Sequence, residues 1–221
     1  MSDDGATTTA GRRSARRQEI LAATRQLFDA NGARDAQIED IARSVGINRA
    51  IIYRHFSGKE ELFAETLVGY LTELSQSLAA ADDESAGPVE RLGALSDAMI
   101  DYGVASPAFV DCALTLLRRP GDELMEEVGQ PVMINLGQSM WSSLSRVVAV
   151  LEAGVTAGDF TVPDPVLLAN VLYTQALGVI SLAMLQLSVG EHHPGMPVAD
   201  SVPLLEIKRY ARVMAVAGAR G

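Results

Sequence analysis

Apolar residues recur along this chain three and four positions apart, which is the spacing of one helical face. No stretch alternates convincingly between apolar and polar residues, as a half-buried strand would. The pattern therefore predicts an all-α fold of about nine helices. Residues 191–203, rich in proline, glycine and histidine, are expected to form a loop. The helices are expected at about 14–31, 37–45, 48–55, 57–81, 88–105, 106–119, 122–157, 164–189 and 204–217.

Short local signals set several of these boundaries. Gly46 permits a tight turn between the second and third helices, and Asn48 is placed to cap the third. Ser57 and Glu60 fit the Ser-x-x-Glu capping box, which predicts the start of the fourth helix. Within the long seventh helix, a kink or break is expected near residues 129–131, because Gly-Gln-Pro disfavours a continuous helix.

Charge is distributed unevenly along a chain whose net charge is −10. Residues 12–59 carry ten Lys and Arg against five Asp and Glu, whereas residues 60–221 carry eight against twenty-one. A basic head on an acidic body suggests a local site for a polyanion, although uneven solvated surface charge is an equally simple explanation. Residues 1–11 are small, polar and acidic with no apolar run, so we expect a disordered leader and no signal peptide.

One segment, residues 165–190, carries no charge and is long enough to span a bilayer. It contains several polar residues, and Asp164 and Glu191 flank it in place of a basic collar. A helix that is apolar on most sides also results when one face meets a core and another meets a partner chain. We therefore expect a buried interface helix, no membrane partner and a cytoplasmic protein.

The basic part of the chain has the layout of a helix-turn-helix DNA reader at about residues 37–56. Asn48, Arg49 and Ala50 open the third helix, which enters the major groove in this motif. Arg49 can pair with the O6 and N7 atoms of guanine, and the small Ala50 allows close approach. The alternative for Arg49 is a contact to phosphate or a solvated surface position.

Three further residues of this region are candidates for phosphate binding. Tyr53 and His55 can each donate a hydrogen bond to a phosphate oxygen, and Lys59 lies at the start of a helix, where free N–H groups favour an anion. A structural hydrogen bond is the usual alternative for His55. A basic run, Arg12, Arg13, Arg16 and Arg17, precedes them; it is expected either to follow the DNA or to form a solvated arm.

Together these residues resemble the tetracycline-repressor (TetR) family. The resemblance covers about fifty residues, and the remaining three quarters agree in helix number and order. It implies a homodimer, with a DNA-binding domain at 12–60 and an effector-binding and dimerisation domain at 61–221. It also implies a repressor that binds a palindromic double-stranded operator and is released by a small molecule. The matching residues are Ile20-Leu21-Ala22-Ala23, Leu27-Phe28, Gly32, Ile38-x-x-Ile41-Ala42, Gly46, Tyr53-x-His55-Phe56 and Lys59-x-x-Leu62.

The chain departs from the family pattern at two places. The family usually opens the second helix with Thr or Ser, where this chain has Ala36 and Gln37, and Asp35 is the nearest substitute cap. Ile51 stands where the family often has a polar Thr on the recognition helix. Ile51 is therefore expected either to touch a thymine methyl group or simply to pack.

A small-molecule pocket is expected between the fifth and eighth helices, lined by apolar groups with a few polar ones. Such a lining predicts a hydrophobic or aromatic effector; the alternative is a filled core. Asp97 and Asp101 face either a cationic ligand or solvent. The eighth and ninth helices are expected to form the dimer interface as a four-helix bundle. The candidate pocket residues are Met99, Tyr102, Phe109, Met133, Met140, Trp141, Leu172, Tyr173 and Gln175.

Residue types needed for other chemistries are scarce. The single Cys112 excludes an intrachain disulfide and a cysteine zinc site, and is expected to be a buried thiol. Only three histidines occur, and His192-His193 is expected in a solvated loop. No catalytic motif or Gly-rich phosphate loop is present, so no enzyme, metal or cofactor is expected. The competing function is a DNA-binding regulator with a filled C-terminal core, controlled by a protein partner or by nothing.

Overall fold

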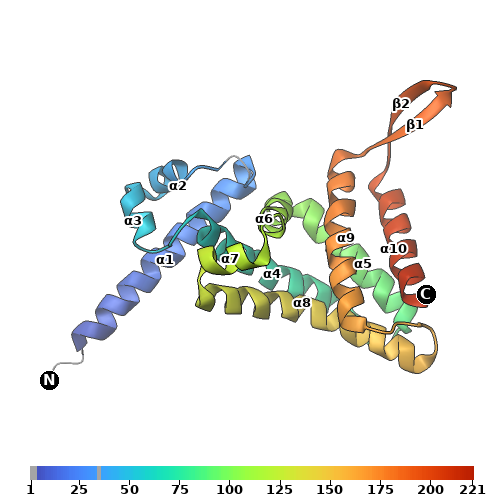
Figure 1. The fold of residues 1–221 in the computed structure, drawn as a ribbon, viewed down its shortest axis with the longest axis horizontal. Coiled ribbons are helices and arrows are strands. Elements are labelled where there is room, and N and C mark those ends of the chain that lie inside the picture. Colours follow the sequence, from blue (N-terminus) through green and yellow to red (C-terminus); the bar gives the residue numbers. More distant parts are fainter. Residues whose placement is uncertain (1–3, 34–35) are drawn as a thin grey trace. The chain divides into compact units, whose positions relative to one another are not determined.

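The computed structural model describes residues 4–33 and 36–221, and the side chains of residues 11–33 and 36–221. The all-α prediction is confirmed for the described residues, which form ten helices and one short hairpin (Figure 1). The tenth helix arises because the break near residue 129 divides the long seventh helix completely. The helices are α1 (Asp4–Asn31), α2 (Ile38–Val45), α3 (Arg49–Tyr53), α4 (Lys59–Ala81), α5 (Pro88–Ala105), α6 (Pro107–Leu117), α7 (Gly121–Val128), α8 (Gln130–Ala157), α9 (Pro165–Leu185) and α10 (Leu204–Arg220).

The chain divides into two compact units, which are described separately. The first unit contains Met1–Tyr70 and Asp111–Gln138, and the second contains Leu71–Val110 and Ser139–Gly221. Helices α4 and α8 each contribute residues to both units. The division into compact units therefore does not coincide with the boundary at residue 60, which remains a prediction about function.

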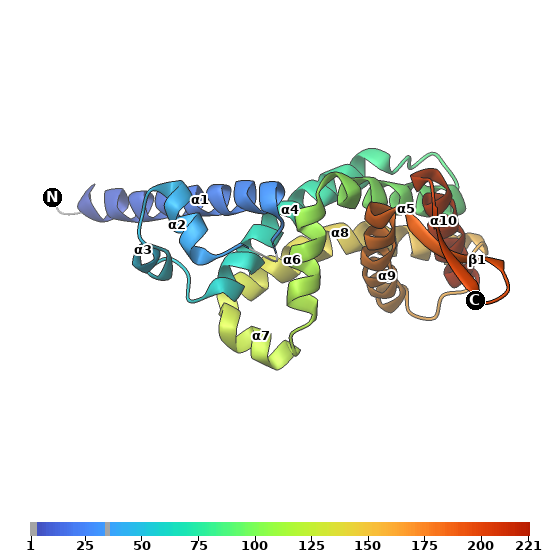
Figure 2. The ribbon, with the colours of Figure 1, turned by 90° about the horizontal axis from the view of Figure 1, so that it is seen from above.

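The first unit is built around α1, with α2 and α3 beside it (Figures 1 and 2). Its core holds Ile20, Phe28, Ile41 and Ile52, all at most 1% exposed. Helix α1 begins at Asp4, ten residues before the predicted start. Residues 1–3 of the expected disordered leader lie outside the described part, and residues 4–11 belong to this helix. Disorder of the leader stays a prediction.

The second unit packs α5, α9 and α10 against one another. One contact needs a glycine: a Cβ atom on Gly103 of α5 would lie 2.5 Å from Cδ1 of Ile180 on α9. The side chain of Asp164 caps α9 by accepting from the Leu167 N–H at 2.9 Å. Helix α9 ends at Leu185 rather than at the predicted residue 189, because Gln186 adopts the left-handed conformation with φ of 51°.

The region after α9 contradicts the sequence prediction of a loop and no strand. Strands β1 (Leu187–His193) and β2 (Met196–Ser201) form an antiparallel hairpin. Pro194 and Gly195 connect them, and Gly195 has a φ of 79°, which suits the third position of a type II turn. The sequence alternates regularly over only four residues, Leu187-Ser188-Val189-Gly190. Three of them lie within the helix predicted to end at residue 189.

Candidate nucleic-acid interface and effector cavity

The helix-turn-helix is formed as the sequence predicts. Gly46 has a φ of 70°, and its N–H donates to the Arg43 carbonyl at 3.1 Å, which closes the end of α2. Asn48 caps α3, since its side-chain oxygen accepts from the Ile51 N–H at 3.1 Å. Ile52 is buried and holds α3 against the unit. Helix α3 ends at Tyr53, two residues earlier than predicted, and Asp35 lies outside the described residues.

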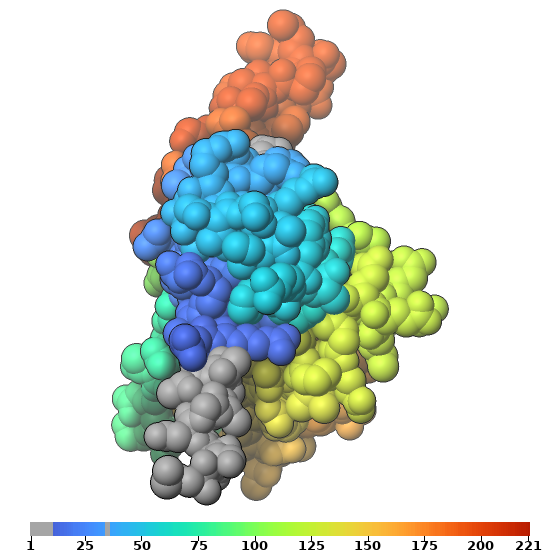
Figure 3. Space-filling view, turned by 90° about the vertical axis from the view of Figure 1, so that its left-hand side faces the viewer, coloured from blue at the N-terminus to red at the C-terminus, as the bar shows by residue number. Residues whose placement is uncertain are grey.

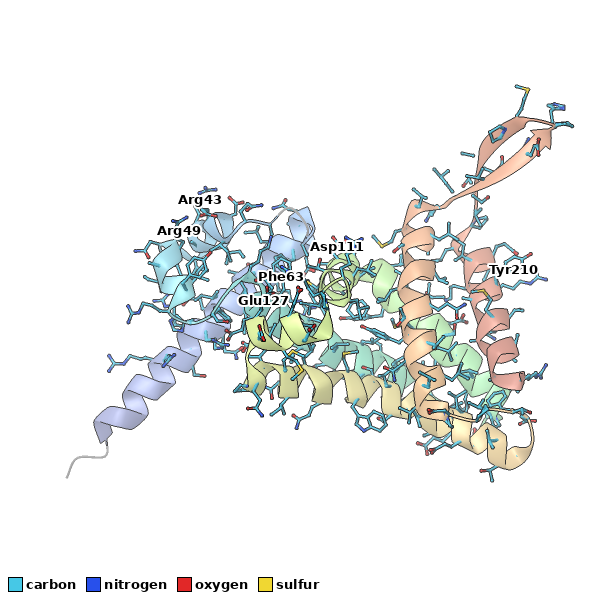
Figure 4. The ribbon with its side chains drawn as sticks, viewed as in Figure 1. Arg43, Arg49, Phe63, Asp111, Glu127 and Tyr210 are labelled. Atoms are coloured by element: carbon cyan, nitrogen blue, oxygen red, sulfur yellow. The ribbon has the colours of Figure 1, made fainter. Side chains whose placement is uncertain are left out.

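The outer side of α3 carries the residues predicted to read bases. Asn48, Arg49 and Ala50 are exposed, and Ile51 is half-buried. The Arg49 side chain is 69% exposed, and its Nη1 lies 3.0 Å from Oε1 of Glu39 on α2. Figure 4 shows Arg49 and Arg43 on the outside of α3 and α2, and Figure 3 shows the surface of these helices in light blue and cyan. This surface is therefore open to a ligand, and a ligand that binds Arg49 would compete with Glu39.

The three candidates for phosphate contact differ in their surroundings. Tyr53 is 51% exposed. His55 is half-buried, and its Nδ1 is buried with no hydrogen-bond partner among the residues that the structure describes. Burial, followed by the charges of Arg13 and other nearby arginines, lowers the pKa of His55, so the ring is neutral near pH 7. Lys59 is half-buried at the start of α4, with Nζ 5.0 Å from the centre of the Phe63 ring.

The Arg17 side chain packs within the first unit and is not part of a DNA-facing arm. Its guanidinium lies 4.2 Å from the centre of the Phe56 ring, and its Nη2 lies 2.6 Å from Oε1 of Glu61. It also donates to Glu65 and to the backbone carbonyl of His55. Of the basic run at the start of the chain, Arg17 is thus fixed by α4, and the arm interpretation fails for it.

The start of α4 corrects the predicted capping box. The Ser57 N–H donates to Oε2 of Glu61 at 2.6 Å, whereas Glu60 pairs with Arg119 at 2.9 Å. The Ser57 hydroxyl donates to the Glu127 carbonyl at 3.1 Å. Because α4 begins at Lys59, its third residue is Glu61, so the capping carboxylate lies one position later than the sequence pattern suggested.

A cavity opens inside the second unit, between α4, α5, α8, α9 and α10. The centre of a water-sized sphere can occupy about 70 Å³ of this cavity. The whole empty volume, including the part open to solvent, is about 650 Å³. The smaller figure gives room for several water molecules. Most lining groups are apolar. Four predicted pocket residues, Met99, Leu172, Tyr173 and Gln175, line it together with Ser96 and Ser143.

Tyr173 supplies an unusual polar group to this cavity. Burial raises the pKa of its hydroxyl, which has no hydrogen-bond partner within the described parts of the chain. A phenol in apolar surroundings normally finds a partner. Tyr173 is therefore a candidate hydrogen-bonding residue of the cavity lining.

The five other pocket candidates lie elsewhere. The Tyr102 hydroxyl donates to Glu73 at 3.3 Å, and its ring packs edge-on against Phe109 at 5.4 Å. Trp141 is 50% exposed and Met140 is half-buried, and neither lines the cavity. Met133 belongs to the first unit. Helical spacing alone placed these side chains on faces that turn away from the empty space.

Asp97 and Asp101 already have cationic partners in α10. Lys208 donates to Asp101 at 2.8 Å, and Arg212 donates to Asp97. These pairs connect α5 to α10. The two carboxylates are therefore part of the helix packing, although Oδ1 of Asp97 is buried with no hydrogen-bond partner among the described residues. The alternative of a cationic ligand stays a prediction.

The outer faces of α9 and α10 expose large apolar side chains. On α9, Leu167 and Leu185 are 60% and 62% exposed; on α10, Leu205 and Tyr210 are 74% and 67% exposed. Tyr210 lies on the outside of α10 in Figure 4. By length and composition α9 could cross a membrane, although 28% of its apolar window is buried in this structure. Large exposed apolar side chains on two neighbouring helices are typical of an interaction surface.

Comparison with known proteins places this arrangement in a family. Residues 20–66 match the model of bacterial regulatory proteins of the tetR family. Over 159 residues the chain is 37% identical to the HTH-type transcriptional repressor KstR2 of Mycobacterium tuberculosis, covering 70% of this chain and 74% of KstR2. The chain belongs to the TetR family. The predicted resemblance is confirmed, and KstR2 of Rhodococcus jostii is also 30% identical over 72% of this chain and 74% of its own.

Solved structures show the same fold at lower identity. RolR in complex with its ligand resorcinol has a TM-score of 0.67 at 13% identity, covering 95% of this chain and 90% of RolR. The ketosteroid transcriptional regulator KstR2 of Mycobacterium tuberculosis has a TM-score of 0.58 at 23% identity, covering 93% and 95%. As a TetR-family member, this chain is a DNA-binding transcription regulator and not an enzyme.

Proposed function

We propose that this TetR-family chain is a cytoplasmic repressor that binds a palindromic operator as a dimer and is released by a hydrophobic small molecule. The exposed N-terminal end of α3 carries the DNA-binding part of the proposal. Asn48, Arg49, Ala50 and Ile51 would face base edges, and Tyr53, His55 and Lys59 would contact phosphates. For His55 the contact would have to come from Nε2, because its Nδ1 is buried.

The uncharged outer face of α9, together with α10, supports dimerisation. In a two-fold symmetric interface each residue near the axis meets its own copy, so any charge there would face a like charge. Residues 165–190 carry no charge, which removes this penalty. Two copies of α3 would then read half-sites about one turn of DNA apart.

The cavity supports control by an effector over the competing function with a filled core. Its apolar lining favours a hydrophobic or aromatic compound, and the free hydroxyl of Tyr173 favours one that carries a hydrogen-bonding group. Resorcinol bound to RolR is a compound of this general kind. Because the empty space holds only several water molecules, a larger effector would have to displace part of the wall.

The test begins with selection of bound sequences from random duplex DNA by the purified protein. Enrichment of a palindrome with half-sites about one turn apart supports the dimeric reader. The selected duplex then serves as the probe for an effector screen. An effector that weakens DNA binding must itself bind more weakly when operator is present, by the same factor. No enriched sequence at low salt would contradict the proposed function, and unchanged effector affinity would contradict its allosteric part.

A further inference from the structure

The hairpin between α9 and α10 has one apolar and one polar face. Residues directly opposite in an antiparallel pair share a face. Leu187, Val189 and their partners Ser201 and Ala199 lie on one side, as do Pro197 and its partner Glu191 toward the tip. We call this side the apolar face. Ser188, Asp200, Gly190 and Val198 lie on the other side, where His192 Nε2 and Asp200 Oδ2 are 3.0 Å apart.

The apolar face is largely uncovered by the residues that the structure describes. Val189 is 84% exposed and Leu187 is 42% exposed. Figure 1 shows the hairpin projecting past the ends of α9 and α10. A lone two-stranded ribbon is marginally stable in water. Here a hydrogen bond stabilises its base, since the Val202 N–H donates to the Gln186 carbonyl at 3.0 Å. An apolar face on such a ribbon is therefore explained best by a partner that packs on it.

The edges of the ribbon are unsuited to strand addition. A register irregularity interrupts β1 between Glu191 and His193, and Pro197 lacks an N–H in β2. Both features protect an edge from pairing with another strand. Recognition through side chains of the apolar face, rather than through backbone edges, follows from this arrangement.

We propose that the apolar face of the hairpin packs against a second copy of this chain and extends the dimer interface of α9 and α10. This inference rests on the dimer of the proposed function. The face is continuous with α9: Leu187 follows the exposed Leu185 by two residues, within the same uncharged stretch that suits symmetric pairing. The hairpin thus acts as an arm that holds the two copies together beyond the ends of the helices.

The test is the dimer dissociation constant of the full chain, measured by sedimentation velocity over a concentration series. Val189→Asp places a carboxylate on the apolar face, and Val198→Asp makes the same change on the opposite face of the same ribbon. Because unpaired charge is costly to bury, Val189→Asp is expected to raise the dimer Kd at least about tenfold. Val198→Asp is expected to change it less than about threefold. Far-UV circular dichroism checks that both variants keep the wild-type helix content.

A third variant, Val171→Asp on the exposed side of α9, separates the inference from the dimer itself. If Val171→Asp weakens the dimer and Val189→Asp does not, the hairpin inference is overturned while the dimeric regulator stands. If the wild type is a monomer at all concentrations, the proposed dimer and the inference both fail. A third outcome is an unchanged dimer Kd in Val189→Asp, with phospholipid vesicles that bind the wild type but not this variant. The apolar face then binds a membrane, and the inference is wrong.

Discussion

Replacing Arg49 with Ala is expected to remove sequence discrimination rather than general DNA affinity. Arg49 is exposed at the start of α3, and among the described residues it forms an ion pair with Glu39 at 3.0 Å. An exposed pair of this kind contributes little to stability, so the fold should survive the substitution. A bidentate contact to guanine contributes about 1–3 kcal/mol of discrimination, which corresponds to roughly 5- to 150-fold.

Arg43 provides the matched control for this experiment. It is another exposed arginine paired with an acid, Asp40 at 2.8 Å, but it lies on α2. Anisotropy titrations with the selected operator and with random duplex, at several salt concentrations, give the specificity ratio of each variant. Arg49→Ala should reduce the ratio and Arg43→Ala should leave it unchanged. Glu39→Gln should raise operator affinity only while Arg49 is present. An equal loss for both DNAs in Arg49→Ala would refute base reading.

Three other substitutions test further parts of the structure. Lys59→Ala should weaken operator and random DNA about equally and reduce the salt slope by about 1; a selective loss for operator would contradict phosphate binding. Replacing Asp82 with Asn should lower the free energy of unfolding by about 2–4 kcal/mol, because the Asp82 side chain is 1% exposed and accepts from Arg91 at 2.7 Å. The hydrogen bond from Arg91 lowers the pKa of Asp82, so its contribution is present above about pH 4 and lost as pH falls through the folded pKa. Urea unfolding at several pH values should therefore show a flatter acid limb for Asp82→Asn. Gly154→Ala places a Cβ in steric overlap with one edge of the Phe160 ring and should lower the free energy of unfolding by about 1–2 kcal/mol, despite the better helix propensity of alanine; unchanged urea midpoints would contradict this.

The helix-turn-helix was predictable because its signals are local. Gly46 and Asn48 act within four residues of their partners, and both have the conformations that the sequence implies. The capping box at Ser57 was one residue wrong for a related reason. Its pattern counts from Ser57, but Ser57 lies two residues before the first helical residue, and its hydroxyl donates to the Glu127 carbonyl seventy positions away.

Features that depend on distant residues were harder to predict. Tyr102 and Trp141 have the size and polarity of pocket residues, but their direction depends on which helix packs beside them. The hairpin was missed because its apolar face adjoins an apolar helix, so hydropathy runs through the boundary unchanged. The Pro194-Gly195 pair is a turn signal, but it fits the predicted loop as well as a hairpin.

Helix α9 connects the cavity to the exposed surface, which would give the proposed effector control a physical route. Leu172 and Tyr173 line the cavity, while Leu167 and Val171 on the same helix are exposed. A ligand larger than the present empty space has to move a wall, and two of the walls are α9 and α10. Those are the helices of the proposed dimer interface. A shift of either one would change the angle between the two copies and hence the separation of their α3 helices, to which binding at half-sites one turn apart is sensitive.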